Sequence, residues 1–215
     1  MEAEFWHKKW EANQIGFHQE ATNRMLLRFL DRFGLAPGAR VFLPLCGKTR
    51  DIGWLVSQGF QVVGAELSEL AVKQLFEEME IVPIVTARGQ LTQYAADGLC
   101  VFVGDIFALS QQQLGPVDMI YDRAALIALP EETRQRYVEH VITLTNTAPQ
   151  LLITVDYDPA ELKGPPFALP AEKVERLYSA AYGLAMLADE EVPGKLKGIC
   201  DAQEKAWRLK PLETK

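Results

Sequence analysis

Residues 41–66 constrain the fold of this 215-residue chain more than any other feature. Their sequence, VFLPLCGKTRDIGWLVSQGFQVVGAE, reads as a short apolar strand, a polar turn, an amphipathic helix and a second apolar strand that ends in an acid. In the helical part, Ile52, Leu55 and Val56 have the i, i+3, i+4 spacing of one helix face. A strand–helix–strand unit predicts two parallel strands, because such strands need a crossover between them.

Glu66 stands at the carboxyl end of the second strand, which is where open α/β sheets bind their ligands. A carboxylate at this place can accept hydrogen bonds from the two hydroxyls of a ribose. Alternatively, Glu66 caps the next helix at Ser68 or Glu69, because acids are common at helix N-termini. The residues alone leave both roles open.

The turn between the first strand and the helix lacks the glycine fingerprint of a dinucleotide site. It reads Pro44-Leu45-Cys46-Gly47-Lys48, whereas G-x-G-x-x-G lets the backbone approach a pyrophosphate. The side chains of Leu45 and Cys46 would crowd such a group, which argues against NAD or FAD. The turn instead favours a nucleoside ligand without phosphates, such as S-adenosylmethionine.

The rest of the chain alternates between apolar runs and helical patterns. We expect further strands at 99–103, 117–121 and 151–155, and helices at 22–33, 69–80, 131–146 and 172–181. Residues 82–85 are ambiguous and residues 89–98 read as a loop, whereas 185–191 and 202–209 read as two closing antiparallel strands. The predicted fold is therefore α/β: a Rossmann-like, mostly parallel seven-stranded sheet with helices on both faces and an antiparallel C-terminal strand.

Polar residues follow several of the expected strands. The acids are Asp105, Asp122 and Asp156, and each by itself is more often a helix cap or a turn residue than a ligand contact. Arg123 fits that interpretation less well, because it follows Asp122 directly after a buried strand. It could form a local ion pair or approach a ligand.

Composition excludes several classes of function. The net charge of -7 disfavours non-specific binding to nucleic acid or to an anionic membrane. No apolar run approaches the roughly 18 residues of a membrane span, and the charged N-terminus lacks a signal-peptide core. The three cysteines are widely spaced and predict neither a disulfide framework nor a zinc site, and the histidines suggest no metal. We expect one cytoplasmic, monomeric domain over residues 1–215.

Three sequence motifs resemble those of the thiopurine S-methyltransferases, especially the bacterial branch. They are Trp10 with the run Gly16-Phe17-His18, the P-L-C-G-K-x-x-D pattern of residues 44–51, and Y-D-R-A-A-L at residues 121–126. The resemblance covers nearly the whole chain. It implies a class I S-adenosylmethionine-dependent methyltransferase that methylates aromatic and heterocyclic thiols such as 6-mercaptopurine. Selenium or tellurium species, or another small nucleophile, are the alternative acceptors.

The resemblance also implies a role for each matching residue. Five residues would contact the cofactor. Trp10 would close over it, Leu45 would contact its methionine part, and Glu66 would hold the ribose. Asp105 and Ile106 would flank the adenine, together with the neighbouring Gly104.

On the acceptor side, Phe17 would line the pocket. Arg123 would contact both cofactor and acceptor and would be catalytic by stabilising the thiolate or thione form. The match weakens at residues 191–200, which lack an arginine expected near the acceptor, so that Lys195 or Lys197 would have to replace it.

The N-terminal segment has its own expectation. Residues 10–21 show no regular period, so we expect residues 1–22 to form a lid that becomes ordered when the cofactor binds.

Overall fold

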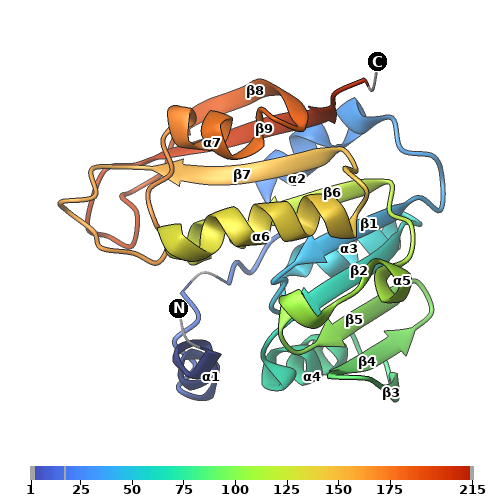
Figure 1. The fold of residues 1–215 in the computed structure, drawn as a ribbon. Helices are drawn as coiled ribbons and strands as arrows, with labels where there is room; N and C mark the ends of the chain where they lie inside the picture. The colour runs from blue at the N-terminus through green and yellow to red at the C-terminus, as the bar shows by residue number, and fades with distance from the viewer. Residues whose placement is uncertain (1–2, 17, 214–215) are drawn as a thin grey trace. The chain divides into compact units, whose positions relative to one another are not determined.

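The computed structural model describes residues 3–16 and 18–213, which form two compact units divided between Asp118 and Met119. Figure 1 labels the α-helices and the strands named below. Each unit is built around its own set of neighbouring strands, with the order β3-β4-β5-β2-β1 in the first unit and β6-β7-β9-β8 in the second.

The first unit contains the expected strand–helix–strand motif. β1 (Arg40–Pro44) leads through α3 (Arg50–Ser57) to β2 (Gln61–Glu66), and β1 and β2 pair in parallel. α4 (Glu69–Glu78) then leads towards β5 (Leu99–Val103), which pairs in parallel with the other edge of β2. The predicted parallel arrangement is confirmed, and it brings the carboxyl ends of three strands to one edge.

The expectation of a loop at residues 89–98 was wrong. β3 (Ile84–Arg88) and β4 (Leu91–Ala96) form an antiparallel hairpin, and β4 pairs antiparallel with β5. The polar residues of β4 conceal the strand pattern, because only Leu91 and Tyr94 are buried. The described part of the chain consequently holds nine strands instead of the expected seven.

The N-terminal part of the first unit contains a helix that the sequence pattern did not reveal, α1 (Ala3–Glu11). α2 (Arg24–Phe29) begins at Asn23, whose side chain accepts hydrogen bonds from the first turn, and continues as η1 (Leu30–Phe33) until Gly34 ends it in the left-handed region. Two short helices complete the unit, η2 (Ile106–Ala108) and α5 (Gln111–Leu114).

The second unit also begins with a parallel pair of strands, and it ends with an antiparallel hairpin. β6 (Met119–Arg123) pairs in parallel with β7 (Gln150–Asp156), with η3 (Leu126–Ala128) and α6 (Glu131–Leu144) between them. After α7 (Ala171–Tyr178), β8 (Tyr182–Glu191) and β9 (Gln203–Pro211) form the expected antiparallel pair, and β9 also pairs antiparallel with β7.

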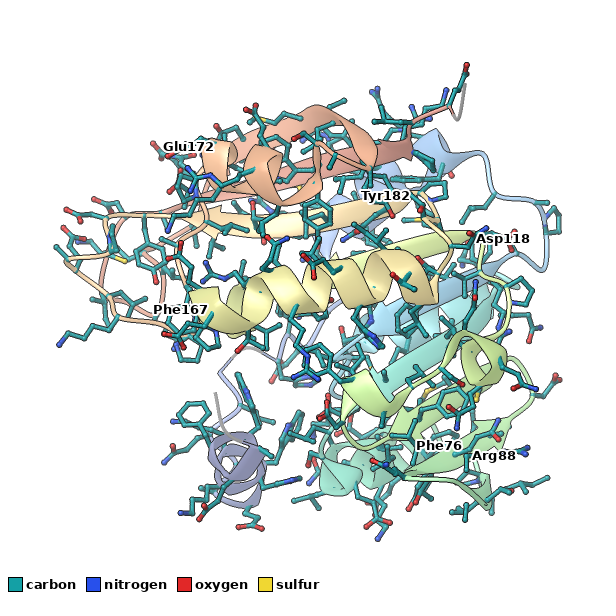
Figure 2. The ribbon with its side chains drawn as sticks, in the orientation of Figure 1. Phe76, Arg88, Asp118, Phe167, Glu172 and Tyr182 are labelled. Carbon is teal, nitrogen blue, oxygen red and sulfur yellow. The ribbon has the colours of Figure 1, made fainter. Side chains whose placement is uncertain are left out.

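Apolar side chains fill the interior of each unit. In the first unit, Val41, Phe42, Ile52 and Leu55 have no exposed surface. In the second, Tyr182 donates a hydrogen bond from its hydroxyl to the carbonyl of Ala148 (Figure 2). Among residues 3–16 and 18–213, no helix has the length and apolar character needed to cross a membrane.

Candidate functional site

The turn after β1 has a strained backbone. Leu45 adopts φ +47° and Gly47 adopts φ +55°, so both lie in the left-handed region. Glycine enters this region readily, but a leucine there is uncommon and costs about 1–3 kcal/mol. Strain of this kind persists where the surroundings hold the backbone in place, and it is often found at binding sites.

Glu66 is the residue that holds this turn. One carboxylate oxygen accepts a hydrogen bond from the Gly47 N–H at 2.7 Å, and the other accepts one from the Ser68 N–H at 2.8 Å. The side chain is 6% exposed. Two backbone donors leave lone pairs of the carboxylate free, because two carboxylate oxygens together offer about four acceptor sites.

Burial shifts the protonation of Glu66. Desolvation raises the pKa of this carboxyl above its ordinary value, and the hydrogen bonds from the Ser68 and Gly47 N–H groups counteract the shift, with a weaker effect from the nearby Leu67 N–H. Burial thus disfavours the charged form of this carboxyl, and the hydrogen bonds from the backbone N–H groups stabilise that form.

Cys46 packs beneath the turn. Its Sγ lies 2.8 Å from where a Cβ would stand on Gly64 of β2, so the two backbones approach closely only because Gly64 has no side chain. Burial, reinforced by the negative charge of Glu66, raises the pKa of the Cys46 thiol well above its ordinary value. The thiol therefore stays protonated and acts in packing instead of as a nucleophile.

Trp10 covers the same turn. It is 4% exposed, and its ring atom Cζ2 lies 3.1 Å from where a Cβ would stand on Gly47. The N-terminal segment therefore lies against the backbone that Glu66 holds. After Trp10, the segment is anchored again at Asn23, whose N–H donates to the buried Asp51 carboxylate at 2.7 Å.

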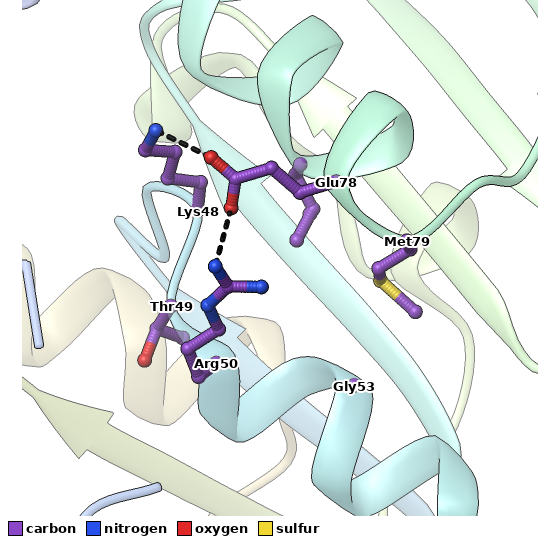
Figure 3. A pocket seen from close by; sticks show the side chains of 7 residues that line it. Lys48, Thr49, Arg50, Gly53, Glu78 and Met79 are labelled. Carbon is purple, nitrogen blue, oxygen red and sulfur yellow. Dashed lines mark hydrogen bonds and ion pairs between the residues drawn. The ribbon is translucent and has the colours of Figure 1, made fainter. Parts of the chain in front are cut away.

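Charged residues hold the turn to α4 on another side. The Glu78 carboxylate accepts a hydrogen bond from Lys48 Nζ at 2.6 Å, and Arg50 Nη2 lies 3.6 Å from its second oxygen (Figure 3). These side chains border a hollow of about 50 Å³. Because this volume is far below that of a usual ligand pocket, we interpret the ion pairs as support for the turn.

Asp105 and Ile106 follow β5, the neighbour of β2. The register pairs Glu66 with Val103, which places Asp105 just beyond the end of the same sheet edge. Asp105 is exposed and accepts a hydrogen bond from the Phe107 N–H at 3.0 Å, whereas Ile106 is buried. Gly104 has φ +135°, and a Cβ there would lie 2.7 Å from Leu91 Cδ2, so packing against the hairpin already explains this glycine.

Arg123 ends β6 in the second unit. Its side chain is half-buried, and it forms no side-chain hydrogen bond or ion pair with any other described residue. Ala124 follows with φ +65°, a second strained non-glycine position at a strand end. A half-buried guanidinium whose donors are not used by residues 3–16 and 18–213 is suited to bind a ligand acceptor group.

Asp122 fixes the loop that carries Arg123. This carboxylate is fully buried and accepts hydrogen bonds from the Tyr137 hydroxyl at 2.7 Å and the Leu126 N–H at 3.1 Å. Burial raises its pKa to about 6, against the lowering effect of these bonds and of one from the Ala125 N–H. The fixed loop indicates a supporting role for Asp122.

The structure brings together Trp10, Leu45 and Glu66 around one turn, with Asp105 and Ile106 on the neighbouring strand end. Arg123 is described within the second unit, and Phe17 lies outside the described residues. Among residues 3–16 and 18–213, no cluster of histidine, cysteine, aspartate and glutamate is suited to hold a metal ion. Sequence reasoning missed Glu78, whose position on an ordinary helix face carries no motif.

Comparison with known proteins identifies the relatives of this chain. The family model described as thiopurine S-methyltransferase (TPMT) matches residues 1–211. A thiopurine S-methyltransferase of Xanthobacter autotrophicus is 53% identical over 210 residues, which cover 97% of this chain and 99% of that protein. One from Gluconobacter oxydans is 44% identical and covers 98% of this chain and 96% of that protein.

Solved structures share the fold at low sequence identity. Magnesium protoporphyrin IX methyltransferase from Synechocystis superimposes with a TM-score of 0.65 at 12% identity, covering 97% of this chain and 100% of that chain. The 1,6-didemethyltoxoflavin-N1-methyltransferase of Burkholderia thailandensis gives 0.66 at 14% identity, covering 96% and 86%. These similarities confirm the predicted Rossmann-like α/β fold.

Proposed function

The chain belongs to the thiopurine S-methyltransferase family and is a methyltransferase, and on this premise we propose that it methylates aromatic and heterocyclic thiols such as thiopurines. The products are the methyl thioether and S-adenosylhomocysteine, with the thiol proton released to solvent. The cofactor, S-adenosylmethionine, supplies a methyl group that is already activated on a sulfonium sulfur. The protein's task is then mainly to position the two reacting atoms.

The residues around the first turn fit this cofactor. Glu66 retains free lone pairs for the ribose hydroxyls, and it stands at the strand end where such ligands bind. Leu45 and Trp10 supply the apolar and aromatic surroundings that a sulfonium favours, since a cation beside an aromatic face gains roughly 0.5–2 kcal/mol. Asp105 and Ile106 would flank the adenine. The bonded Glu66 carboxylate is the observation that carries the cofactor assignment.

The acceptor is assigned to the side of Arg123. An aromatic thiol on an electron-poor heterocycle ionises readily, so the protein needs no strong general base. The guanidinium of Arg123 would stabilise the thiolate or thione electrostatically, and the Asp122 loop would hold it in place. Phe17 would line the pocket.

A methyl-transfer assay tests this function. Turnover of 6-mercaptopurine should exceed turnover of matched amine and phenol acceptors, and selenium or tellurium compounds form a further arm. Preferential methylation of the amine or phenol would contradict the proposal. Calorimetry should detect binding of S-adenosylhomocysteine, and binding of NAD in its place would overturn the cofactor assignment.

Arg123→Ala tests the catalytic role. We expect turnover to fall by about 10- to 100-fold, since one stabilising group of this kind is worth a few kcal/mol at most, while affinity for S-adenosylhomocysteine changes less. Arg123→Lys, which keeps the charge without the planar fork, should retain part of the rate. An equal loss of turnover and cofactor affinity, or no loss, would refute this assignment.

We also propose that residues 1–22 act as a lid on the cofactor. The contact of Trp10 with Gly47 supports this, because it closes the N-terminal segment onto the cofactor turn. Trypsin cleavage at Lys8 and Lys9 should slow when S-adenosylhomocysteine is added, whereas cleavage at Arg88 in the β3–β4 hairpin, which is not part of the proposed lid, should keep its rate. Unchanged cleavage at both places would argue against a lid.

A further inference from the structure

Residues 164–167, with the sequence Gly-Pro-Pro-Phe, form a short segment between β7 and α7 that we call the strap. The Phe167 N–H donates to the carbonyl of Ile127 at 2.7 Å, and the Tyr157 hydroxyl donates to the carbonyl of Pro166 at 2.6 Å. Gly164 has φ +75°, and a Cβ there would lie 2.6 Å from the Phe167 ring. The strap is thus folded tightly on itself, and hydrogen bonds to the rest of the unit hold it at Pro166 and at Phe167.

Arg134 holds the phenylalanine from α6. Its guanidinium lies 5.3 Å from the centre of the Phe167 ring, and its Nε donates to the carbonyl of Leu129 at 2.8 Å. Arg134 is only 4% exposed, so this cation–π contact is shielded from water and is stronger than one on an open surface. Figure 2 shows Phe167 beside the first turn of α6.

Lys197 joins the strap to a second loop. This lysine belongs to the connection between β8 and β9, and its ammonium group donates a hydrogen bond to the carbonyl of Pro165. The contact spans 32 positions in the sequence. Lys197 therefore connects two loops that have no shared secondary structure.

Strand register places both loops at the edge that carries Arg123. β6 and β7 are parallel, with Arg123 opposite Ile153, so their carboxyl ends point the same way. Asp156 at the end of β7 pairs with Gln203, and Gln203 pairs in turn with Glu191 at the end of β8. The strap, the β8–β9 loop and Arg123 consequently belong to one end of the second unit.

We propose that the strap is a wall of the acceptor pocket and that Lys197 is a positioning residue that sets how large an acceptor this wall admits. The inference rests on the proposed thiol methylation. The half-buried apolar surface of Pro165, Pro166 and Phe167 suits a flat aromatic acceptor beside Arg123. Lys197 holds this wall at Pro165, whereas the contacts of Tyr157, Ile127 and Arg134 hold it at Pro166 and Phe167.

The test compares Lys197→Met with Lys163→Met. Lys163 is also exposed, lies next to the strap and has no side-chain hydrogen bond or ion pair with the described residues, so its substitution removes the same charge without the contact. Each variant is assayed with thiophenol and with thiopurines that carry progressively larger ring substituents. Calorimetry with S-adenosylhomocysteine monitors the cofactor site.

For Lys197→Met we expect KM for the smallest thiol to rise about 3- to 10-fold, as the loss of one hydrogen bond allows. KM for the largest substituted thiopurine should stay level or fall, with kcat and cofactor affinity close to the wild-type values. Lys197→Arg should restore the wild-type profile. An unchanged acceptor profile, or the same change in Lys163→Met, would overturn the proposal.

Hydrogen exchange separates failure of this inference from failure of the proposed function. Loss of the Lys197 contact should speed amide exchange in residues 164–169 and 192–202 at least about threefold, whether or not thiols are substrates. If wild-type protein methylates no thiol, the proposed function fails, and the wall assignment fails with it. If thiols are methylated but exchange in both loops is unchanged, Lys197 has no positioning role.

Discussion

Replacing Glu66 with glutamine tests whether one carboxylate both supports the turn and binds the cofactor. The amide keeps one oxygen for an N–H donor, but its NH₂ group then faces the other donor, either Gly47 or Ser68. Losing a charge-assisted hydrogen bond costs about 1.5–3 kcal/mol. Removal of a charge that burial disfavours offsets part of this cost, so we expect the free energy of unfolding to fall by about 1–2 kcal/mol.

The same substitution should weaken cofactor binding. Glutamine offers the ribose hydroxyls one acceptor fewer and no charge, a loss of about 1.4–2.8 kcal/mol or about 10- to 100-fold in Kd. Isothermal titration with S-adenosylhomocysteine measures the affinity, and urea denaturation without ligand measures the stability. Glu77→Gln is the control, because Glu77 is exposed on nearby α4 and has no side-chain partner among the described residues.

The two measurements refute different steps. Unchanged affinity with lowered stability would leave Glu66 as a structural cap and exclude it as the ribose anchor. Unchanged stability would mean that the hydrogen bonds to Gly47 and Ser68 contribute little, contrary to their burial and geometry.

Three further substitutions test the supporting structure. The pKa of Asp122 is about 6 in the folded protein and near 3.8 in the unfolded chain, so the folded state binds the proton more tightly. As pH rises through this range, the free energy of unfolding of the wild type should therefore fall by up to about 3 kcal/mol relative to that of Asp122→Asn. Parallel curves of stability against pH for the two proteins would contradict this. Gly64→Ala should cost about 1–3 kcal/mol through its clash with Cys46, and adding Cys46→Ala should recover part of the melting temperature. Ala124→Gly should raise the free energy of unfolding by about 0.5–1 kcal/mol by relieving its positive φ, and a lower value would show that this backbone is not strained.

The parallel strands could be predicted because their sequences are locally consistent. Residues 41–66 combine strand, helix and turn signals that agree with the final structure, and the expected strand at 99–103 has the bounds of β5. The strand β4, which pairs with both β3 and β5, was missed. It was missed although Asp97-Gly98, the turn between β4 and β5, is a strong signal for a two-residue hairpin. Its polar strand residues masked the period on which the prediction depended.

The candidate site was predictable only in part. Strand ends place Glu66 and Asp105 at the carboxyl ends of strands in the first unit, and Arg123 at the carboxyl end of a strand in the second. Open α/β sheets bind ligands at such ends, and the ligand contacts of these residues stay predictions. Strain at Leu45 and Ala124 leaves no trace in the sequence, because any residue type can be held there by its neighbours. The support from Glu78 depends likewise on contacts between segments that lie far apart in the chain.

Glu66 shows why the two interpretations of a strand-end acid need not compete. A carboxylate that only capped α4 would need the Ser68 N–H alone, yet this one also bonds Gly47 and so fixes the turn on which Trp10 lies. Because both donors use one lone pair on each oxygen, the remaining lone pairs are oriented before any ligand arrives. A ligand that uses them does not have to order the side chain, which lowers the entropic cost of binding. The structural cap is therefore what makes this acid suitable as a ribose anchor.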